Sequence, residues 1–170
     1  MTKTKLLFNY ALIIIFLFSL ASFAHAQQTN SLTSLLTDLK GWKADPAEGM
    51  NMNMNGIKMI NAVREYKRGH ADVTATIMIG NSMMTQGQMQ QMNIENSEAS
   101  IRTKKINGFN LYTNYDKKGK TGVVLIFLDK KNSNQSLFIV SYEGLSETQG
   151  IEFAEKFKWS KIKKATEKLL

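Results

Sequence analysis

The chain has 170 residues, a formal net charge of +8 and no cysteine. The absence of thiols excludes a disulfide framework, thiol catalysis, cysteine metal sites and a lipid-anchored cysteine. The lysines are scattered, and no arginine-rich stripe or interleaved aromatic set accompanies them, so we expect no nucleic-acid partner.

The N-terminal segment Met1–Ala26 predicts an export signal. Two lysines precede an apolar run from Leu6 to Ala24, and Ala24-His25-Ala26 has the small-x-small pattern that signal peptidase cleaves. We expect cleavage between Ala26 and Gln27, a periplasmic or secreted location, and no integral membrane segment afterwards. Retention as an uncleaved anchor is the alternative, because the apolar run approaches the roughly 20 residues that span a bilayer.

Residues 27–170 are predicted to form a single α/β domain that begins with an amphipathic helix. Leucines recur at i, i+3, i+4 and i+7 from Leu32, Ser31 can cap the helix start, and Gly41 is suited to its end. The stretch Glu48–Lys58 is rich in Met, Asn and Gly, and its one regular feature is alternation.

The middle of the chain predicts strands around one helix. Ile60–Tyr66 and Val73–Ile79 alternate as two strands joined at Arg68-Gly69. Ser82–Ile94 is rich in Met and Gln and has Thr85 as its one β-branched residue before Ile94, which favours a short helix. Four further strands are expected at Ala99–Lys105, Phe109–Tyr115, Thr121–Leu128 and Ser136–Tyr142.

A turn signal and two continuous apolar segments support the prediction of these last strands. Asn107-Gly108 is a strong hairpin signal. Val123–Leu128 and Leu137–Val140 are continuously apolar, which is typical of central strands covered on both faces.

The C-terminal part predicts two helices. Ser146 and Gln149 form the S-x-x-Q capping pattern before an apolar stretch, so a helix begins there. A basic helix is expected from Ser160. We interpret it as a surface helix docked on the sheet; a membrane-binding helix is the alternative. The basic charge of the whole chain would allow weak contact with anionic envelope surfaces, and a solvated, solubilising surface is the other interpretation of the same charges.

The predicted fold class is therefore α+β, with a mostly antiparallel sheet flanked by helices. Ala62-Val63-Arg64-Glu65-Tyr66, a glycine turn and Val73-Thr74-Ala75-Thr76-Ile77 resemble the PsbP-like α/β/α sandwich of small exported proteins. The stretch from Gly41-Trp42 to Met59 is similar to that of uncharacterised bacterial exported proteins. The resemblance implies a non-catalytic accessory or binding domain, and it transfers no functional residue.

Catalytic signals are sparse. His70 is the one histidine beyond the export signal, and its place beside Gly69 is typical of a solvated turn. The chain has no G-x-S-x-G, paired-histidine or phosphate-loop pattern. We therefore expect no catalytic residue and no cofactor. A hydrolase or other enzyme whose site the sequence hides is the third hypothesis.

The methionines suggest a second hypothesis, metal binding. In an extended segment Met50, Met52 and Met54 would share one face and offer three thioethers to Cu(I) or Ag(I). Met83, Met84 and His70 would join if the fold brought them close. Thioethers persist in an oxidising compartment, where cysteine would be lost to disulfides.

Two other interpretations use the same methionines. They can fill irregular gaps in a core, or they can form a flexible groove through Met83, Met84 and Met89 for an apolar ligand or a partner helix. The first hypothesis remains an exported binding or accessory protein, monomeric or weakly dimeric. Its partner would be an unknown protein or a small apolar ligand.

Overall fold

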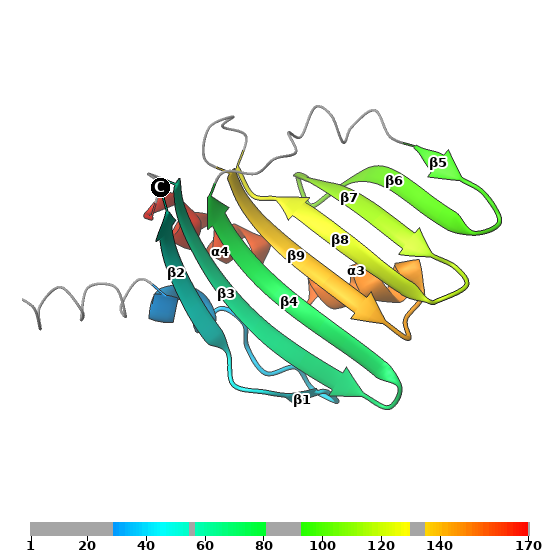
Figure 1. Ribbon diagram of the computed structural model, residues 1–170, viewed down its shortest axis with the longest axis horizontal. Coiled ribbons are helices and arrows are strands. Elements are labelled where there is room, and N and C mark those ends of the chain that lie inside the picture. Colours follow the sequence, from blue (N-terminus) through cyan, green and yellow to red (C-terminus); the bar gives the residue numbers. More distant parts are fainter. Residues whose placement is uncertain (1–28, 55–56, 81–92, 130–134, 170) are drawn as a thin grey trace, which may run out of the picture.

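The structure is a computed structural model that describes residues 29–54, 57–80, 93–129 and 135–169 (Figure 1). The predicted export signal lies outside the described residues. The predicted helix at Ser82–Ile94 also lies outside them, apart from Asn93 and Ile94, as do the groove candidates Met83, Met84 and Met89.

One antiparallel sheet runs through the described part of the chain, in the order β1-β3-β4-β9-β8-β7-β6-β5, with β2 also paired to β3. The chain is α+β, as predicted, because this sheet dominates and few helices accompany it. The strands are β1 (Lys43–Ala44), β2 (Glu48–Met54), β3 (Ile57–Arg68), β4 (Ala71–Gly80), β5 (Ile94–Glu95), β6 (Ala99–Ile106), β7 (Phe109–Asp116), β8 (Thr121–Phe127) and β9 (Gln135–Glu143).

The hairpin of β3 and β4 follows directly from alternating side chains. Along β4 the residues from Ala71 to Ile79 alternate between buried and more exposed, so one face of the strand enters the core. Gly69, with φ +61°, allows the tight reversal between the two strands. The two strands predicted here are therefore confirmed.

The four predicted strands of the second half form the meander β6-β7-β8-β9. Asn107 and Gly108 both have positive φ, 51° and 83°, which is the conformation of a two-residue hairpin turn. β9 then pairs with β4 and joins the meander to the first hairpin. β8 and β9 are interior strands, as their continuous apolar runs predicted.

Two helices, α3 (Glu147–Glu155) and α4 (Trp159–Glu167), pack on one face of the sheet, behind it in Figure 1. Ser146 caps α3 through the predicted capping box with Gln149. The buried Trp159 Nε1 donates to Ala154 O at 2.8 Å, which ties α4 to α3. None of the helices in the described ranges is long and apolar enough to cross a membrane.

The main core lies between these helices and the sheet. Tyr66, Phe138, Phe153 and Phe157 make edge-on or tilted ring contacts at its centre. The Tyr66 hydroxyl donates to Thr37 O at 3.0 Å, and burial raises its pKa to about 12.

Apolar side chains also lie on the face of the sheet opposite the helices, which we call the second face. Tyr112, Phe127 and Leu137 are buried there, and Met78, Ile101, Leu125 and Ile139 pack against them. Among the described residues, no helix lies on this face (Figure 1).

The first predicted helix is shorter than its leucine pattern indicated. Residues 29–33 are helical, but the chain then turns, although Leu36 is still buried. Arg64 explains the early end. Its Nη1 donates to Leu36 O at 2.6 Å, its Nε donates to Asp45 O at 2.7 Å, and it forms an ion pair with Asp38. These tertiary contacts hold residues 36–45 against β3 instead of in a helix.

The prediction of a helix through Ile94 was wrong at both of its described residues, because Asn93 is not helical and Ile94 belongs to β5. Ile94 pairs with Ile101 on β6. Asn96 closes the turn that follows, because its Oδ1 accepts the backbone N–H groups of Glu98 and Ala99 at 2.9 and 2.7 Å. This local turn and the ion pairs of Glu95 favour a short strand.

Candidate functional site

The methionine-rich segment forms the strand β2 at the edge of the sheet. Met52 lies directly opposite Met59 on β3, and Met50 lies opposite Asn61. Side chains of residues that face each other in an antiparallel pair point to the same side of the sheet. Ile60 lies between Met59 and Asn61 on β3 and is buried in the main core, so Met59 and Asn61 point to the opposite side of the sheet. The methionines therefore lie on the second face. We call Met50, Met52 and Met59 the methionine edge.

The methionine edge is open to solvent. Met50 is 56% exposed and Met52 is 40% exposed, and Met59 is half-buried. Core packing is therefore the wrong interpretation for Met50 and Met52. Met54 ends β2, but its side chain lies outside the described part of the chain. The strand conformation assumed by the metal hypothesis is confirmed, and metal binding itself stays a prediction.

His70 does not join the methionines. It is exposed in the turn between β3 and β4, at the far end of β3 from Met59. Arg68 is nine positions along β3 from Met59, which corresponds to roughly 30 Å. The proposed contribution of His70 to a methionine site was therefore wrong, because strand β3 holds the two groups apart.

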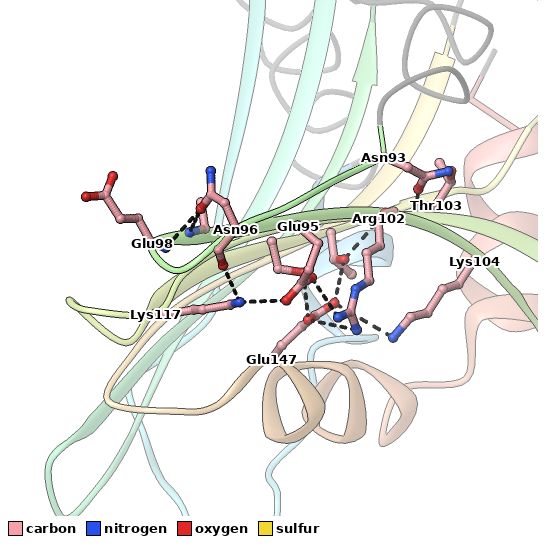
Figure 2. A network of polar contacts seen from close by, with 12 residues as sticks. Asn93, Glu95, Asn96, Glu98, Arg102, Thr103, Lys104, Lys117 and Glu147 are labelled. Carbon is pink, nitrogen blue, oxygen red and sulfur yellow. Dashed lines mark hydrogen bonds and ion pairs between the residues drawn. The ribbon is translucent and has the colours of Figure 1, made fainter.

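A second cluster, the Glu147 network, lies between the start of α3 and the strands β6 and β7 (Figure 2). The Glu147 carboxylate accepts hydrogen bonds from Thr113 Oγ1 at 2.8 Å and from Ser100 Oγ at 3.2 Å. Arg102 and Lys104 form ion pairs with it at 3.5 and 3.7 Å. The Glu147 side chain is 12% exposed, so its charge is largely desolvated and depends on these partners.

Glu95 on β5 extends the network to the edge of the sheet. Arg102 Nη2 and Lys117 Nζ donate to its carboxylate at 2.7 and 2.6 Å (Figure 2). The hydrogen bond from Lys117, followed by that from Arg102, lowers the pKa of Glu95 to about 2. Both carboxylates of the network are thus matched by cations. This arrangement holds β5, β6, β7 and α3 together and suits a structural role better than proton transfer.

A shallow concavity of about 550 Å³ lies at the end of the second face nearest the β3–β4 turn. Thr74 and Ser141 lie among its lining residues with Asp72, Asp116 and Glu143. Asp116 already accepts the backbone N–H groups of Lys118 and Gly119, and Asp72 lies 3.9 Å from Lys67. Its carboxylates are therefore partly engaged in local contacts.

Tyr142 packs beneath this end of the sheet, between Gly122 and Gly150. A Cβ atom at either glycine would collide with the tyrosine ring, so the close fit requires both. Burial raises the pKa of the Tyr142 hydroxyl, which has no hydrogen-bond partner among the described residues. Tyr142 is therefore a neutral packing group.

A smaller cavity of about 310 Å³ lies beside the junction of α3 and α4. Phe157 and Ile162 form a buried apolar floor, and Lys156, Lys158 and Lys161 are exposed around it. Contact with an anionic surface would concentrate at this basic rim.

Sequence reasoning missed Met59 as a neighbour of Met52 and missed the whole Glu147 network. Met59 was visible as a methionine, but its position opposite Met52 depends on the β2–β3 register. Residues in direct contact within the network are up to 47 positions apart in the chain, so no local sequence pattern indicates it.

Comparisons with protein-family models, curated proteins and solved structures find no match for this chain.

Proposed function

We propose that the chain is a non-catalytic binding or accessory protein of the bacterial envelope, exported by its N-terminal signal, and that it contacts a partner protein through the methionine edge. One observation carries the proposal. Met50, Met52 and Ile94 are the large hydrophobic side chains exposed on the described surface, and the two methionines stand together on one strand. Flexible, polarisable methionine side chains suit a surface that adapts to a partner.

The position of β2 supports a protein partner. Within the described residues β2 pairs with β3 alone, so its outer backbone groups face away from the sheet. An extended segment of another protein can pair with such an edge while its side chains contact the thioethers.

Site-specific photo-crosslinking in the exporting cell tests this proposal. A benzoylphenylalanine residue replaces Met52 in one variant and Ile94 in a matched control, since both positions are exposed apolar sites on edge strands. We expect a discrete protein adduct at position 52 that is absent at position 94. No adduct at position 52, or the same adducts at both positions, would contradict the proposal.

The second candidate function is binding of Cu(I) or Ag(I) in the periplasm. The alternation of Met50 and Met52 on the exposed face of β2 favours it, because thioethers are soft ligands that select soft monovalent ions. A Cu(I) titration against a competing chelator tests it, with Met50, Met52 and Met54 all replaced by Leu as the control. Leucine keeps the apolar volume and removes the sulfur. Binding that is indifferent to the triple replacement would end this candidate.

For the fold, we propose a PsbP-like α/β/α sandwich. The helices on one face of an antiparallel sheet support one outer layer. The burial of Tyr112, Phe127 and Leu137 supports a second layer on the opposite face. An experimental structure that left the second face bare would contradict it.

A further inference from the structure

We infer that the methionine edge is a single site for one soft monovalent cation, Cu(I) or Ag(I), in which Met59 is a ligand together with Met50 and Met52. The inference rests on the second candidate function and assigns it a ligand from a neighbouring strand. A site built across β2 and β3 differs from a linear motif, because the register of two strands must be formed before the thioethers converge.

The register brings the three side chains within reach of one ion. Met52 and Met59 are directly opposite, so their Cα atoms lie about 4.5–5.5 Å apart. Met50 is two residues from Met52 on the same strand, roughly 6.6 Å away, and lies diagonally across from Met59 at about 7–8 Å. Each methionine has three rotatable side-chain bonds, so the sulfurs can meet above the sheet.

Asn61 supplies an independent observation at the same place. It lies opposite Met50 and two residues from Met59, so its side chain is on the second face with them. Its Oδ1 is buried and has no hydrogen-bond partner among the described residues. An unpaired buried acceptor costs free energy. A cation held by the three sulfurs would place a positive charge beside this oxygen and remove that cost.

The charge around the site also favours a cation. Glu48, Met50 and Met52 are every second residue of β2, so their side chains lie on the same face. The Glu48 carboxylate is the next side chain on that face after Met50. It is exposed and lies opposite the uncharged Val63. A monovalent ion therefore enters a site with a nearby negative charge.

The ligand chemistry selects the ion. Thioethers are soft and uncharged, whereas Zn(II) and Cu(II) sites in proteins use imidazole, thiolate or carboxylate ligands. The chain has no cysteine, and His70 lies at the far end of β3. We therefore expect Cu(I) and Ag(I) to bind and Zn(II) to leave the methionines unchanged.

The test uses the protein purified after export and follows the methyl resonances of its methionines by NMR during titration with Ag(I), which, unlike Cu(I), is not oxidised by air and does not disproportionate. We expect the Met50, Met52 and Met59 methyl signals to shift together and saturate at one equivalent. Met78 is the matched control, because it lies on the same face and diagonally across from Met59, as Met50 does, but its side chain packs against the buried Tyr112, Phe127 and Leu137. Its signal should stay in place, and Zn(II) should move none of the four.

Affinity for Cu(I), measured against a competing chelator, tests each ligand. Replacement of a residue outside the ligand shell of a metal site already costs about 10–100-fold in affinity. We therefore expect Met52→Leu and Met59→Leu each to raise the Kd at least tenfold and Met78→Leu to leave it unchanged. Because Met52 is exposed, Met52→Leu reports on binding even if Met59→Leu disturbs the strand pair.

The outcomes separate the inference from the function on which it rests. If Met50→Leu and Met52→Leu weaken binding and Met59→Leu does not, copper binding stands and the cross-strand site is wrong. If no replacement changes the affinity, or no ion binds, both are wrong. An equal loss with Met78→Leu would also overturn the assigned ligand set.

Discussion

At the scale of single residues, the Glu147 carboxylate is largely removed from water, because its side chain is 12% exposed. It accepts hydrogen bonds from two hydroxyl groups, on Ser100 and Thr113, that are 1% and 0% exposed as residues. Removing the carboxylate leaves both hydroxyls and the cation of Arg102 without this acceptor. We expect Glu147→Ala to lower the free energy of unfolding by about 2–3 kcal/mol.

Urea denaturation measures this loss, with Glu152→Ala as the matched control. Glu152 is exposed on the same helix, so its replacement should change stability by less than about 0.5 kcal/mol. Glu147→Gln should fall between the two, because its amide oxygen can still accept one hydroxyl hydrogen bond. Equal stability of the Glu147→Ala and Glu152→Ala variants would show that the network contributes nothing.

At the scale of elements, the capping box positions α3 and therefore Glu147. Ser146 Oγ accepts the backbone N–H of Gln149 at 3.3 Å, and the Gln149 side chain accepts the N–H of Ser146 at 2.9 Å. We expect Ser146→Ala to cost about 1 kcal/mol and Ser146→Asp to retain most of the stability, since aspartate also caps helices. Thermal unfolding compares them with Ser160→Ala in the first turn of α4. An equal loss for Ser160→Ala would mean that the cost at Ser146 is not specific to its role as a helix cap.

Elements with a local signal were predicted, and those defined by distant contacts were not. The alternation along β3 and β4, the Asn107-Gly108 turn and the Ser146 cap each act within a few residues, so the sequence alone is sufficient for them. The first helix ends early because Arg64, on β3, donates a hydrogen bond to the carbonyl oxygen of Leu36. β5 is held in place by the ion pair of Glu95 with Lys117, which lies 22 positions further along the chain. Neither partner is adjacent in sequence.

At the scale of the whole molecule, the same distinction applies to the candidate site. Alternation was enough to place Met50 and Met52 on one face. Their exposure, and the addition of Met59, depend on the position of β2 as an edge strand paired to β3. The sheet also separates His70 from the methionines, which a linear motif could not reveal.

The Glu147 network also makes the stability of the whole molecule depend on pH. The pKa of Glu95 is lowered from 4.5 to about 2 in the fold by its hydrogen bonds from Lys117 and Arg102. A carboxyl group with a lowered pKa stabilises the folded state above the pKa of the unfolded chain, and this contribution disappears as the pH falls through the folded pKa. The loss should therefore occur between pH 4.5 and pH 2. Below that range Lys117 and Arg102 face a neutral group.

Thermal unfolding of the wild type and of Glu95→Gln at pH 7, 4.5 and 2 isolates this contribution from the general repulsion of a basic chain in acid. Glu95→Gln removes the titrating group, so we expect the difference in Tm between the two proteins to be largest at pH 7, nearly the same at pH 4.5, and close to zero at pH 2. Glu98→Gln is the control, because Glu98 is an exposed carboxylate in the adjoining turn. A Glu95→Gln difference that persisted unchanged at pH 2 would mean that the glutamine disturbs packing and that the charge pairs of β5 do not stabilise the fold.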